Sequence, residues 1–373
     1  MTDRGLPAAP PPPAAGSRLR RALPAFLAAL LFMGATAPGC SGGKTTLKVM
    51  FAGSLIVPFA ALEEAYEAAH PDVDVQMEGH GSIQVIRHVT EIGDLVDVAV
   101  TADAALIPLL MYAVEVPETG EPFASWYIEF ATGHLTLGYR GSSAYAGEID
   151  AGNWYEVVGR PGVTLGLADP RLDAAGYRAL MVLALAQEQY RQPTLFYDLA
   201  GSRLRPPVLL HEEPGRTVIE VPELLEPRSG SGLLMRGSSI QLTALLESGD
   251  LDYAFEYESV IRQHGLQMVP LPDSLNLGAE AYRDTYQGVQ VRLDYRRFAS
   301  VEPVFDGDAI RYAVTIPANA PEPEEAVSFV AFLLGPEGRA IMEANYQEML
   351  EQPEADRYDA LPDDLRSVAV PAP

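Results

Sequence analysis

The chain has 373 residues, 48% of them hydrophobic, which suits about two domains with substantial cores. Its formal net charge of −25 excludes the basic surface that binding to nucleic-acid phosphates needs, and its single cysteine excludes an internal disulfide bond. Such acidity repels anions at long range, so any anion site must work through local dipoles and hydrogen bonds.

The single cysteine, Cys40, ends a segment typical of a lipoprotein signal peptide. Arginines at positions 18, 20 and 21 precede an apolar run over residues 22–33, and small residues then lead to Cys40. The apolar run is too short for a stable transmembrane helix. We predict that residues 1–40 are a signal peptide and that lipidated Cys40 anchors the mature protein in the periplasm or at the cell surface. A buried, unreactive thiol is the alternative.

After this segment, the chain alternates short apolar strands with helices. Apolar runs predict strands at residues 47–51, 73–77 and 96–100. Apolar residues at helical spacing predict helices at residues 58–69, 83–89 and 104–112. Strands that alternate with helices predict a parallel sheet in an α/β fold.

A second region begins near Thr132 and again mixes strands and helices. Strands are expected at residues 135–139, 163–167, 217–221, 251–255 and 312–316. Helices are expected at residues 176–189, 238–247 and 324–334, and the last should stop at Gly335-Pro336. The acidic, Pro-rich tail after Gln352 is expected to be draped or loose.

Four predicted strand-to-helix turns carry glycine and short polar residues: Gly53-Ser54, Gly81-Ser82, Asp173-Ala174-Ala175-Gly176 and Gly237-Ser238-Ser239. Free N–H groups and the positive end of the helix dipole favour an anion at a helix start. Ligands of open parallel sheets bind at the ends of strands where such turns lie. Any one turn alone is more typical of a helix cap. Four of them in two regions predict an anion site, with Gly53 and Gly81 among its candidate residues.

Longer motifs surround these turns and follow one another along the chain. They are Phe51-Ala52-Gly53-Ser54-Leu55, Trp126-Tyr127-Ile128-Glu129-Phe130-Ala131-Thr132, Gly176-Tyr177-Arg178-Ala179-Leu180-Met181, Asp252-Tyr253-Ala254-Phe255-Glu256-Tyr257 and Leu333-Leu334-Gly335-Pro336-Glu337-Gly338. In this order, over roughly residues 47–347, the chain resembles the archaeal-type tungstate/molybdate-binding proteins of ABC importers. The resemblance implies the type II periplasmic-binding fold, an α/β fold with two lobes, two mixed sheets flanked by helices and a hinge between the lobes.

The resemblance also implies how the chain divides between the lobes. Lobe 1 is expected to comprise residues 46–131 together with 265–373, and lobe 2 residues 132–264. The hinge strands should then lie near Thr132 and His264, and the lobes should close over a bound ligand.

The family's site residues map onto this chain through their motifs. By resemblance, Ser54 and Ser82 donate hydrogen bonds to the oxyanion, and Asp173 and Tyr257 complete the set. Ser239 stands where the family's R-P-K-E stretch ends in a glutamate. One of the two carboxylates that can coordinate the metal of the oxyanion is therefore absent. A tetrahedral oxyanion held by hydroxyl and N–H groups remains the expectation, with Ser239 as a further donor.

Asp173 has three possible roles, because a fully deprotonated oxyanion would repel a buried carboxylate beside it. It can be a direct ligand of an expandable metal centre in the oxyanion. It can accept a proton from a protonated anion such as phosphate. It can also lie outside the site as a helix cap, the position that Asp favours.

These features predict a lipid-anchored substrate-binding component of an ABC importer, working as a monomer with a transmembrane permease and its ATPase. Tungstate or molybdate is the expected ligand, and no cofactor is expected. The sequence has no nucleophile–base pair, G-x-S-x-G elbow or P-loop, which argues against an enzyme. The alternatives are the same fold with specificity for phosphate, sulfate or an organic anion, and a sensor or enzyme on that fold.

Overall fold

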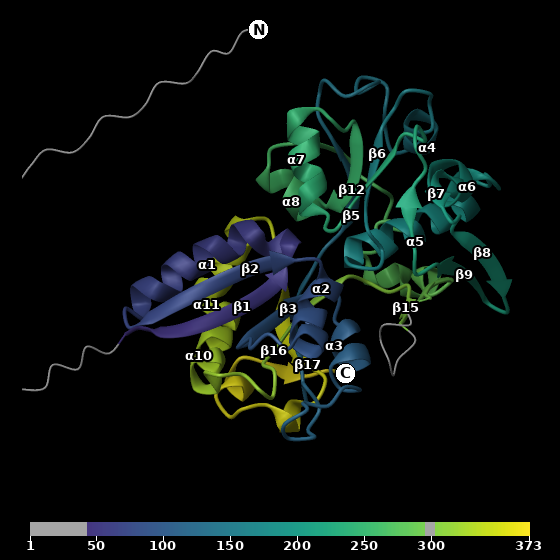
Figure 1. Cartoon of the computed structure of the whole chain (residues 1–373). Coiled ribbons are helices and arrows are strands. Elements are labelled where there is room, and N and C mark those ends of the chain that lie inside the picture. The colour runs from purple at the N-terminus through teal and green to yellow at the C-terminus, as the bar shows by residue number, and fades with distance from the viewer. Residues whose placement is uncertain (1–42, 295–302) are drawn as a thin grey trace, which may run out of the picture. The chain divides into compact units, whose positions relative to one another are not determined.

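The computed structural model describes residues 43–294 and 303–373 (Figure 1). The predicted signal peptide and the predicted lipidation at Cys40 lie outside the described residues. Within the described ranges, no helix is both long enough and apolar enough to span a membrane.

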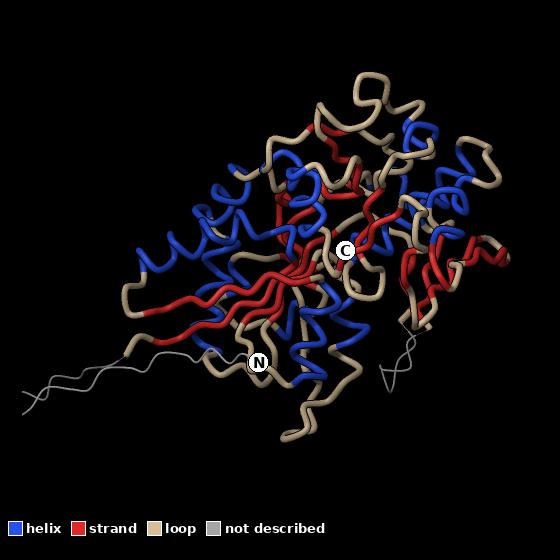
Figure 2. Tube along the Cα trace, turned by 45° about the horizontal axis from the view of Figure 1, so that its top comes forward, coloured by secondary structure: helices blue, strands red, loops and turns tan. Residues whose placement is uncertain are grey.

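One sheet has seven strands, drawn from both ends of the described chain. They are β1 (Thr45–Ala52), β2 (Val73–His80), β3 (Val98–Thr101), β4 (Ile128–Thr132), β16 (Arg311–Thr315), β17 (Glu348–Ala355) and β18 (Val370–Pro371). Their order is β18-β17-β4-β16-β3-β1-β2. β1 runs parallel to β2 and β3, whereas β16 runs antiparallel to β3 and β4, so the sheet is mixed. The strands lie side by side, flanked by helices (Figure 2).

The residue pattern explains why the first elements form. In β1, Leu47 and residues 49–52 are all buried, which is typical of a parallel strand covered on both faces. Helix α1 (Ile56–Ala69) buries Phe59, Leu62 and Tyr66 at spacings of three and four residues. The other helices of this part are α2 (Ser82–Arg87), α3 (Leu106–Leu110), α10 (Pro323–Leu334) and α11 (Pro336–Ala344).

A second mixed sheet has five strands in the order β11-β6-β12-β5-β13. They are β5 (Leu135–Tyr139), β6 (Leu165–Ala168), β11 (Leu233–Arg236), β12 (Tyr253–Tyr257) and β13 (Gln267–Val269). Helix α5 (Ala174–Gln189) is buried over almost its whole length and contacts strands of this sheet. Its apolar residues surround the axis, as expected for a core helix. The remaining helices are α4 (Trp154–Val158), α6 (Leu195–Leu199), α7 (Ile240–Ser248), α8 (Glu258–Gln263) and α9 (Arg283–Tyr286).

A four-stranded sheet, in the order β15-β14-β9-β8, packs on α5 and was largely missed by the sequence analysis. Its strands are β8 (Leu209–Glu213), β9 (Arg216–Val221), β14 (Val289–Leu293) and β15 (Val304–Asp306). Only the strand at residues 217–221 was predicted, because β8 carries three consecutive polar residues and shows no apolar run. The two-stranded pair β7 (Leu204–Arg205) and β10 (Glu226–Pro227) lies in the same part of the sequence.

The C-terminal part of the chain confirms one expectation and corrects another. Helix α10 ends at Leu334, before Gly335-Pro336 as predicted, and Pro336 then starts α11, because proline is well placed in the first turn of a new helix. The expectation of a loose tail after Gln352 is wrong, since β17 pairs with β4 and β18 pairs with β17. The tail thereby supplies backbone partners for a strand that would otherwise be a sheet edge.

The strand pairing also bears on how the chain divides between the sheets. β4 ends at Thr132 and β5 begins at Leu135, where the chain passes from the first sheet to the second. After His264, β13 still pairs with β5 and β14 pairs with β9, and the chain rejoins the first sheet at β16. The predicted lobe boundaries stay a prediction, and this pairing favours a return later than His264.

Candidate anion-binding site

The four predicted turns follow the carboxyl ends of strands that run parallel to a neighbour, and they come together. Gly53-Ser54 follows β1, and Gly81-Ser82 follows β2. Asp173 caps α5 after β6, and Ser239 directly precedes α7 after β11. Turns of one sheet touch turns of the other. The Gln84 N–H donates to the Leu172 carbonyl at 3.3 Å, and a Cβ added at Gly53 would lie 3.2 Å from Ile240 Cγ2.

Glycine is required at position 81 because another part of the backbone passes directly over it. A Cβ there would collide with the Leu172 carbonyl oxygen and lie 3.1 Å from Asp173 Cβ. The close approach brings Ser82 and Asp173, which come from different sheets, to one place. This meeting of the two sequence motifs could not be read from either motif alone.

The two predicted serines are both buried and lie on the side of the first sheet. Ser54 Oγ lies 3.1 Å from the Tyr312 hydroxyl, and either oxygen can be the donor. Ser82 Oγ accepts the Ala102 N–H at 3.0 Å, so its own proton remains available to an acceptor. Each serine thus has one partner from its own sheet and keeps hydrogen-bonding capacity for a ligand.

Asp173 is a buried helix cap that also connects two turns. Its Oδ1 accepts the Ala175 N–H at 2.9 Å, and its Oδ2 accepts the Ser239 N–H at 3.0 Å. Burial raises the pKa of this carboxyl to about 6, against the lowering effect of the two N–H donors. The cap role is therefore observed, whereas direct contact with a ligand stays a prediction.

Tyr257 ends β12 and is held by a buried cation that the sequence analysis missed. Arg178 Nη1 donates to the Tyr257 hydroxyl at 2.9 Å and to the Ala102 carbonyl at 2.5 Å. The Tyr257 ring also lies beside Tyr312, with 5.8 Å between centroids. An arginine in the otherwise apolar stretch of α5 was the signal that could have revealed it, because a charge is buried only with partners.

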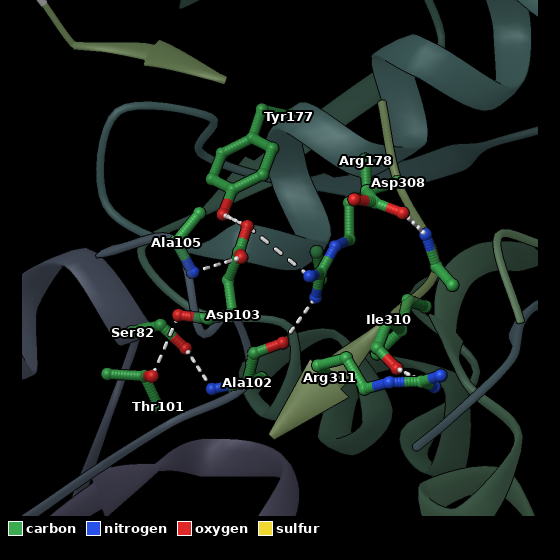
Figure 3. A network of polar contacts seen from close by, with 12 residues as sticks. Ser82, Thr101, Ala102, Asp103, Ala105, Tyr177, Arg178, Asp308, Ile310 and Arg311 are labelled. Carbon is green, nitrogen blue, oxygen red and sulfur yellow. Dashed lines mark hydrogen bonds and ion pairs between the residues drawn. The ribbon is translucent and has the colours of Figure 1, made fainter. Parts of the chain in front are cut away.

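Asp103 completes a link between the first sheet and α5 (Figure 3). Arg178 Nη2 lies 3.3 Å from Asp103 Oδ2, and the Tyr177 hydroxyl donates to the same carboxylate. Ser82 Oγ, the Ala102 peptide and the Arg178 guanidinium therefore form one continuous chain of hydrogen bonds. The candidate site and the link between the two sheets share these groups.

Glu256 is a second buried carboxyl that was not predicted. It lies just before Tyr257 in β12 and is 0% exposed. Its Oε1 accepts the Tyr257 N–H at 2.8 Å, and its Oε2 lies 3.5 Å from the Thr243 hydroxyl. Burial raises the pKa of Glu256 to about 8, and the neighbouring Asp173 raises it as well. A glutamate in the middle of the apolar run Tyr253–Tyr257 was the available signal.

The chemistry of the site is that of hydrogen-bond donors in a buried setting. Hydroxyl groups come from the two serines and two tyrosines, and the guanidinium of Arg178 lies behind them. Among the residues that the structure describes, no group of three or more His, Cys, Asp or Glu side chains is placed to hold a metal ion. The arrangement suits an anion that accepts hydrogen bonds through its oxygens.

A cavity of about 570 Å³ lies elsewhere, at the connection between β4 and β5. Thr132, His134, Glu258, Arg262 and Gln347 are among its lining residues, and it includes none of the four turns. It therefore does not mark the predicted site. The candidate site lies instead where the four turns bring buried hydrogen-bond donors together.

The chain is similar to known solute-binding proteins over most of its length. The family model of the bacterial extracellular solute-binding proteins matches residues 47–346. The chain belongs to this family. It is accordingly the solute-binding component of an ABC transporter, and the proteins of this family act in transport rather than as enzymes.

Relatives of this solute-binding protein extend over most of its length. An uncharacterized solute-binding protein of Petrotoga mobilis is 36% identical over 318 residues, covering 85% of this chain and 88% of the relative. The molybdate/tungstate-binding protein WtpA of Thermococcus kodakarensis is 32% identical over 360 residues, covering 92% of this chain and 95% of the relative.

Solved structures establish the fold. The periplasmic molybdate-binding protein of Azotobacter vinelandii matches with a TM-score of 0.52 at 15% identity, covering 82% of this chain and 100% of that structure. The sulfate-binding protein SubI of Mycobacterium tuberculosis matches with a TM-score of 0.52 at 14% identity, covering 88% and 93%. The solute-binding protein has the two-lobed type II periplasmic-binding fold, as predicted.

Proposed function

We propose that this solute-binding protein captures an inorganic oxyanion, tungstate or molybdate, between its lobes and delivers it to an ABC permease and its ATPase. The observation that carries the proposal is the meeting of four short polar turns from two sheets, with buried hydroxyls of Ser54 and Ser82 among them. The choice of tungstate or molybdate is supported by the name of the Thermococcus relative, a molybdate/tungstate-binding protein.

The hydroxyl groups are the main donors to the anion in this proposal. The Ser82 hydroxyl accepts the Ala102 N–H and can donate its own proton to the anion. The Ser54 hydroxyl pairs with the Tyr312 hydroxyl and can turn from it to donate to the anion. A hydrogen bond to a charged partner contributes about 1.5–3 kcal/mol, so two serines with adjacent N–H groups account for substantial affinity. Such local donors work despite the repulsion of the net charge of −25.

The residues at positions 239 and 173 bear on whether the anion is bound through its oxygens or through its metal atom. Ser239 replaces the glutamate of the resembling family, which leaves Asp173 as the one carboxylate at the matched positions. Both Asp173 oxygens already accept backbone N–H groups. We therefore propose a tetrahedral oxyanion bound by donors, with Asp173 and Tyr257 assisting, rather than a metal centre ligated by two carboxylates.

One observation favours a second candidate, a protonated anion such as hydrogen phosphate. With a pKa of about 6, Asp173 is mainly a carboxylate at pH 7 and can accept a proton from the ligand. A fully deprotonated dianion offers no such proton. Asp173 would therefore strengthen the binding of hydrogen phosphate and weaken the binding of tungstate and sulfate.

A thermal-shift and calorimetry panel on the purified protein tests the proposal. Tungstate and molybdate should raise the melting temperature more than sulfate, phosphate or organic acids at equal concentration. Asp173→Asn separates the two candidates, because it should weaken phosphate binding and spare or improve tungstate binding. A response to phosphate alone would replace the proposed ligand, and no response to any anion would reject an oxyanion site.

The proposed anchoring and closure have tests of their own. Labelled palmitate should enter the wild-type chain and not Cys40→Ala, and equal labelling would reject the lipid anchor. Small-angle scattering should show a more compact monomer with saturating ligand. An unchanged profile would contradict closure of the proposed lobes around residues 132 and 264.

A further inference from the structure

Arg178 of α5 is a buried cation that contacts groups of both sheets, and only 4% of its surface is exposed. Its Nη1 donates to the Tyr257 hydroxyl at 2.9 Å and to the Ala102 carbonyl at 2.5 Å. Its Nη2 lies 3.3 Å from Asp103 Oδ2, and Figure 3 shows the guanidinium directed toward Ala102 and Asp103. One side chain therefore holds the end of β12 and the residues that follow β3.

The contact with Arg178 fixes which way the Tyr257 hydroxyl bonds. A guanidinium only donates hydrogen bonds, so the Tyr257 oxygen must be the acceptor, and the Tyr257 proton must go elsewhere. Tyr257 is 1% exposed, and Arg178 is the one hydrogen-bond partner of its hydroxyl within residues 43–294 and 303–373. A buried O–H without an acceptor is costly. The Tyr257 proton is therefore available to a bound ligand.

Arg178 reaches Ser82 in the same way, through the backbone of Ala102. The Ala102 carbonyl accepts from Arg178, and the Ala102 N–H donates to Ser82 Oγ at 3.0 Å. Because the N–H can only donate, Ser82 Oγ is the acceptor and keeps its own proton. Ser82 is 1% exposed, and no described residue accepts that proton. A second buried hydroxyl is thus left with a proton for a ligand.

The pair of Ser54 and Tyr312 adds a third proton of this kind. Their hydroxyl oxygens lie 3.1 Å apart, so one proton lies between them and the other has no acceptor among the described residues. The Tyr312 ring lies beside that of Tyr257, with 5.8 Å between centroids. The buried hydroxyls therefore offer more donors than the protein itself can use. This excess matches a ligand that accepts hydrogen bonds and carries no proton of its own.

We propose that Arg178 is a positioning residue of the anion site, which directs the hydroxyl protons of Tyr257 and Ser82 to the ligand. Asp103 neutralises its charge, so Arg178 acts through these hydroxyls rather than as the counter-ion of the anion. The inference rests on the oxyanion-binding function proposed above. It makes the site selective for fully deprotonated anions, because such anions can accept every hydrogen bond that the hydroxyls offer.

Calorimetric titrations of the purified full chain with tungstate and with phosphate at pH 8.5 test this. Both anions are then dianions, and only hydrogen phosphate carries a proton. Arg178→Met should weaken tungstate binding about tenfold, as expected for the loss of one hydrogen bond to a charged group. It should weaken phosphate binding less, because the released Tyr257 oxygen can accept the phosphate proton. A purely structural loss would weaken the binding of both anions by the same factor.

Two further variants separate positioning from the link between the sheets. Tyr177→Phe is the matched control, because the Tyr177 hydroxyl donates to the same Asp103 carboxylate but bonds neither Tyr257 nor Ala102. This variant should bind tungstate like the wild type. Arg178→Lys keeps the test valid if Arg178→Met fails to fold. It retains a cation for Asp103 but lacks the planar fork of donors, so tungstate binding should still weaken more than phosphate binding.

The outcomes distinguish this inference from the proposed function. Unchanged tungstate affinity in the Arg178 variants, or equal losses for tungstate and phosphate, would overturn the positioning role and leave the function intact. A loss in Tyr177→Phe as large as that in Arg178→Met would do the same, and this comparison decides alone where phosphate binds neither protein. If the wild type binds neither tungstate, molybdate nor sulfate, the proposed function fails and this inference fails with it.

Discussion

The two sides of the candidate site differ in kind. The side from the first sheet presents Ser54 and Ser82, neutral hydroxyls whose partners are a tyrosine and a backbone N–H. The side from the second sheet presents Asp173 and Glu256, buried carboxyls whose pKa values are raised by burial to about 6 and about 8. The first side offers donors that do not titrate near neutral pH, and the second carries groups whose ionisation makes stability depend on pH.

This difference places neutral donors and titratable groups on opposite sides of one candidate site. A neutral donor can be placed by its backbone turn alone, because it costs little to bury once it has a partner. A carboxyl needs donors or a proton at every pH. The start of α7 supplies the Ser239 N–H to Asp173 and the Thr243 hydroxyl to Glu256. Arg178 joins the two sides and should matter to both.

The largest effect is expected from removing Arg178. Its buried guanidinium pairs with Asp103 and donates to Tyr257 and Ala102. Arg178→Met should lower the free energy of unfolding by about 3–5 kcal/mol, because it leaves Asp103 without its ionic partner. Urea denaturation measures the loss.

An exposed ion pair provides the control for that variant. Arg205 and Glu226 are 70% and 59% exposed, and Arg205→Met should change stability by about 1 kcal/mol or less. The double variant Arg178→Met with Asp103→Asn should lose less than the sum of the single losses. Additive losses would mean that the pair does not act as a unit.

The next largest effect tests the neutral side. Ser54→Ala or Ser82→Ala should weaken tungstate binding by about ten- to a hundredfold, as expected for one hydrogen bond to a charged group. Calorimetry at pH 7 is the measurement. Ser367→Ala, an exposed serine that bonds only the Asp364 carbonyl, is the control and should bind normally. Normal binding by both site variants would remove this side from the site.

A charge added to the second side should change selectivity. Ser239→Glu restores the carboxylate of the resembling family, so the ratio of tungstate to sulfate affinity should rise about tenfold. Tungsten can accept additional oxygen ligands and sulfur cannot, which is why the two anions should diverge. An unchanged ratio in competition titrations would show that position 239 does not select the anion.

The smallest expected effect is the change in the free energy of unfolding with pH. The pKa values of Asp173 and Glu256 are raised above their ordinary values, so the folded protein binds more protons than the unfolded chain between about pH 4 and pH 8. The free energy of unfolding should therefore fall as pH rises through this window, by at most about 1.4 kcal/mol per unit and group.

Urea denaturation at pH 5 to 8.5 measures this slope. Glu256→Gln should reduce the slope between about pH 6 and pH 8, where Glu256 contributes, whereas Glu129, whose pKa burial raises to about 7, should keep part of it. Ser82→Ala, on the neutral side, should leave the slope unchanged. A slope that Glu256→Gln does not alter would contradict a raised pKa at this residue.

Local sequence patterns predicted many of the helices and strands. Elements that depend on partners far away in the sequence were not predicted. Helical spacing and capping residues identified α1, α5, α7 and α10, because these signals act over a few residues. The polar strand β8 and the acidic strand β17 were missed, since both gain their partners from other strands rather than from their own composition. The correction at the C-terminal tail has the same cause.

The sequence by itself determined the class of fold, the four polar turns and the replacement of a family glutamate by Ser239. Only the tertiary structure decided that Arg178 reaches Asp103, that Tyr312 lies beside Ser54, and that Glu256 is buried against the first turn of α7. Turns and caps follow from neighbouring residues, whereas the pKa of a carboxyl and the partner of a guanidinium depend on which distant segments exclude water from it.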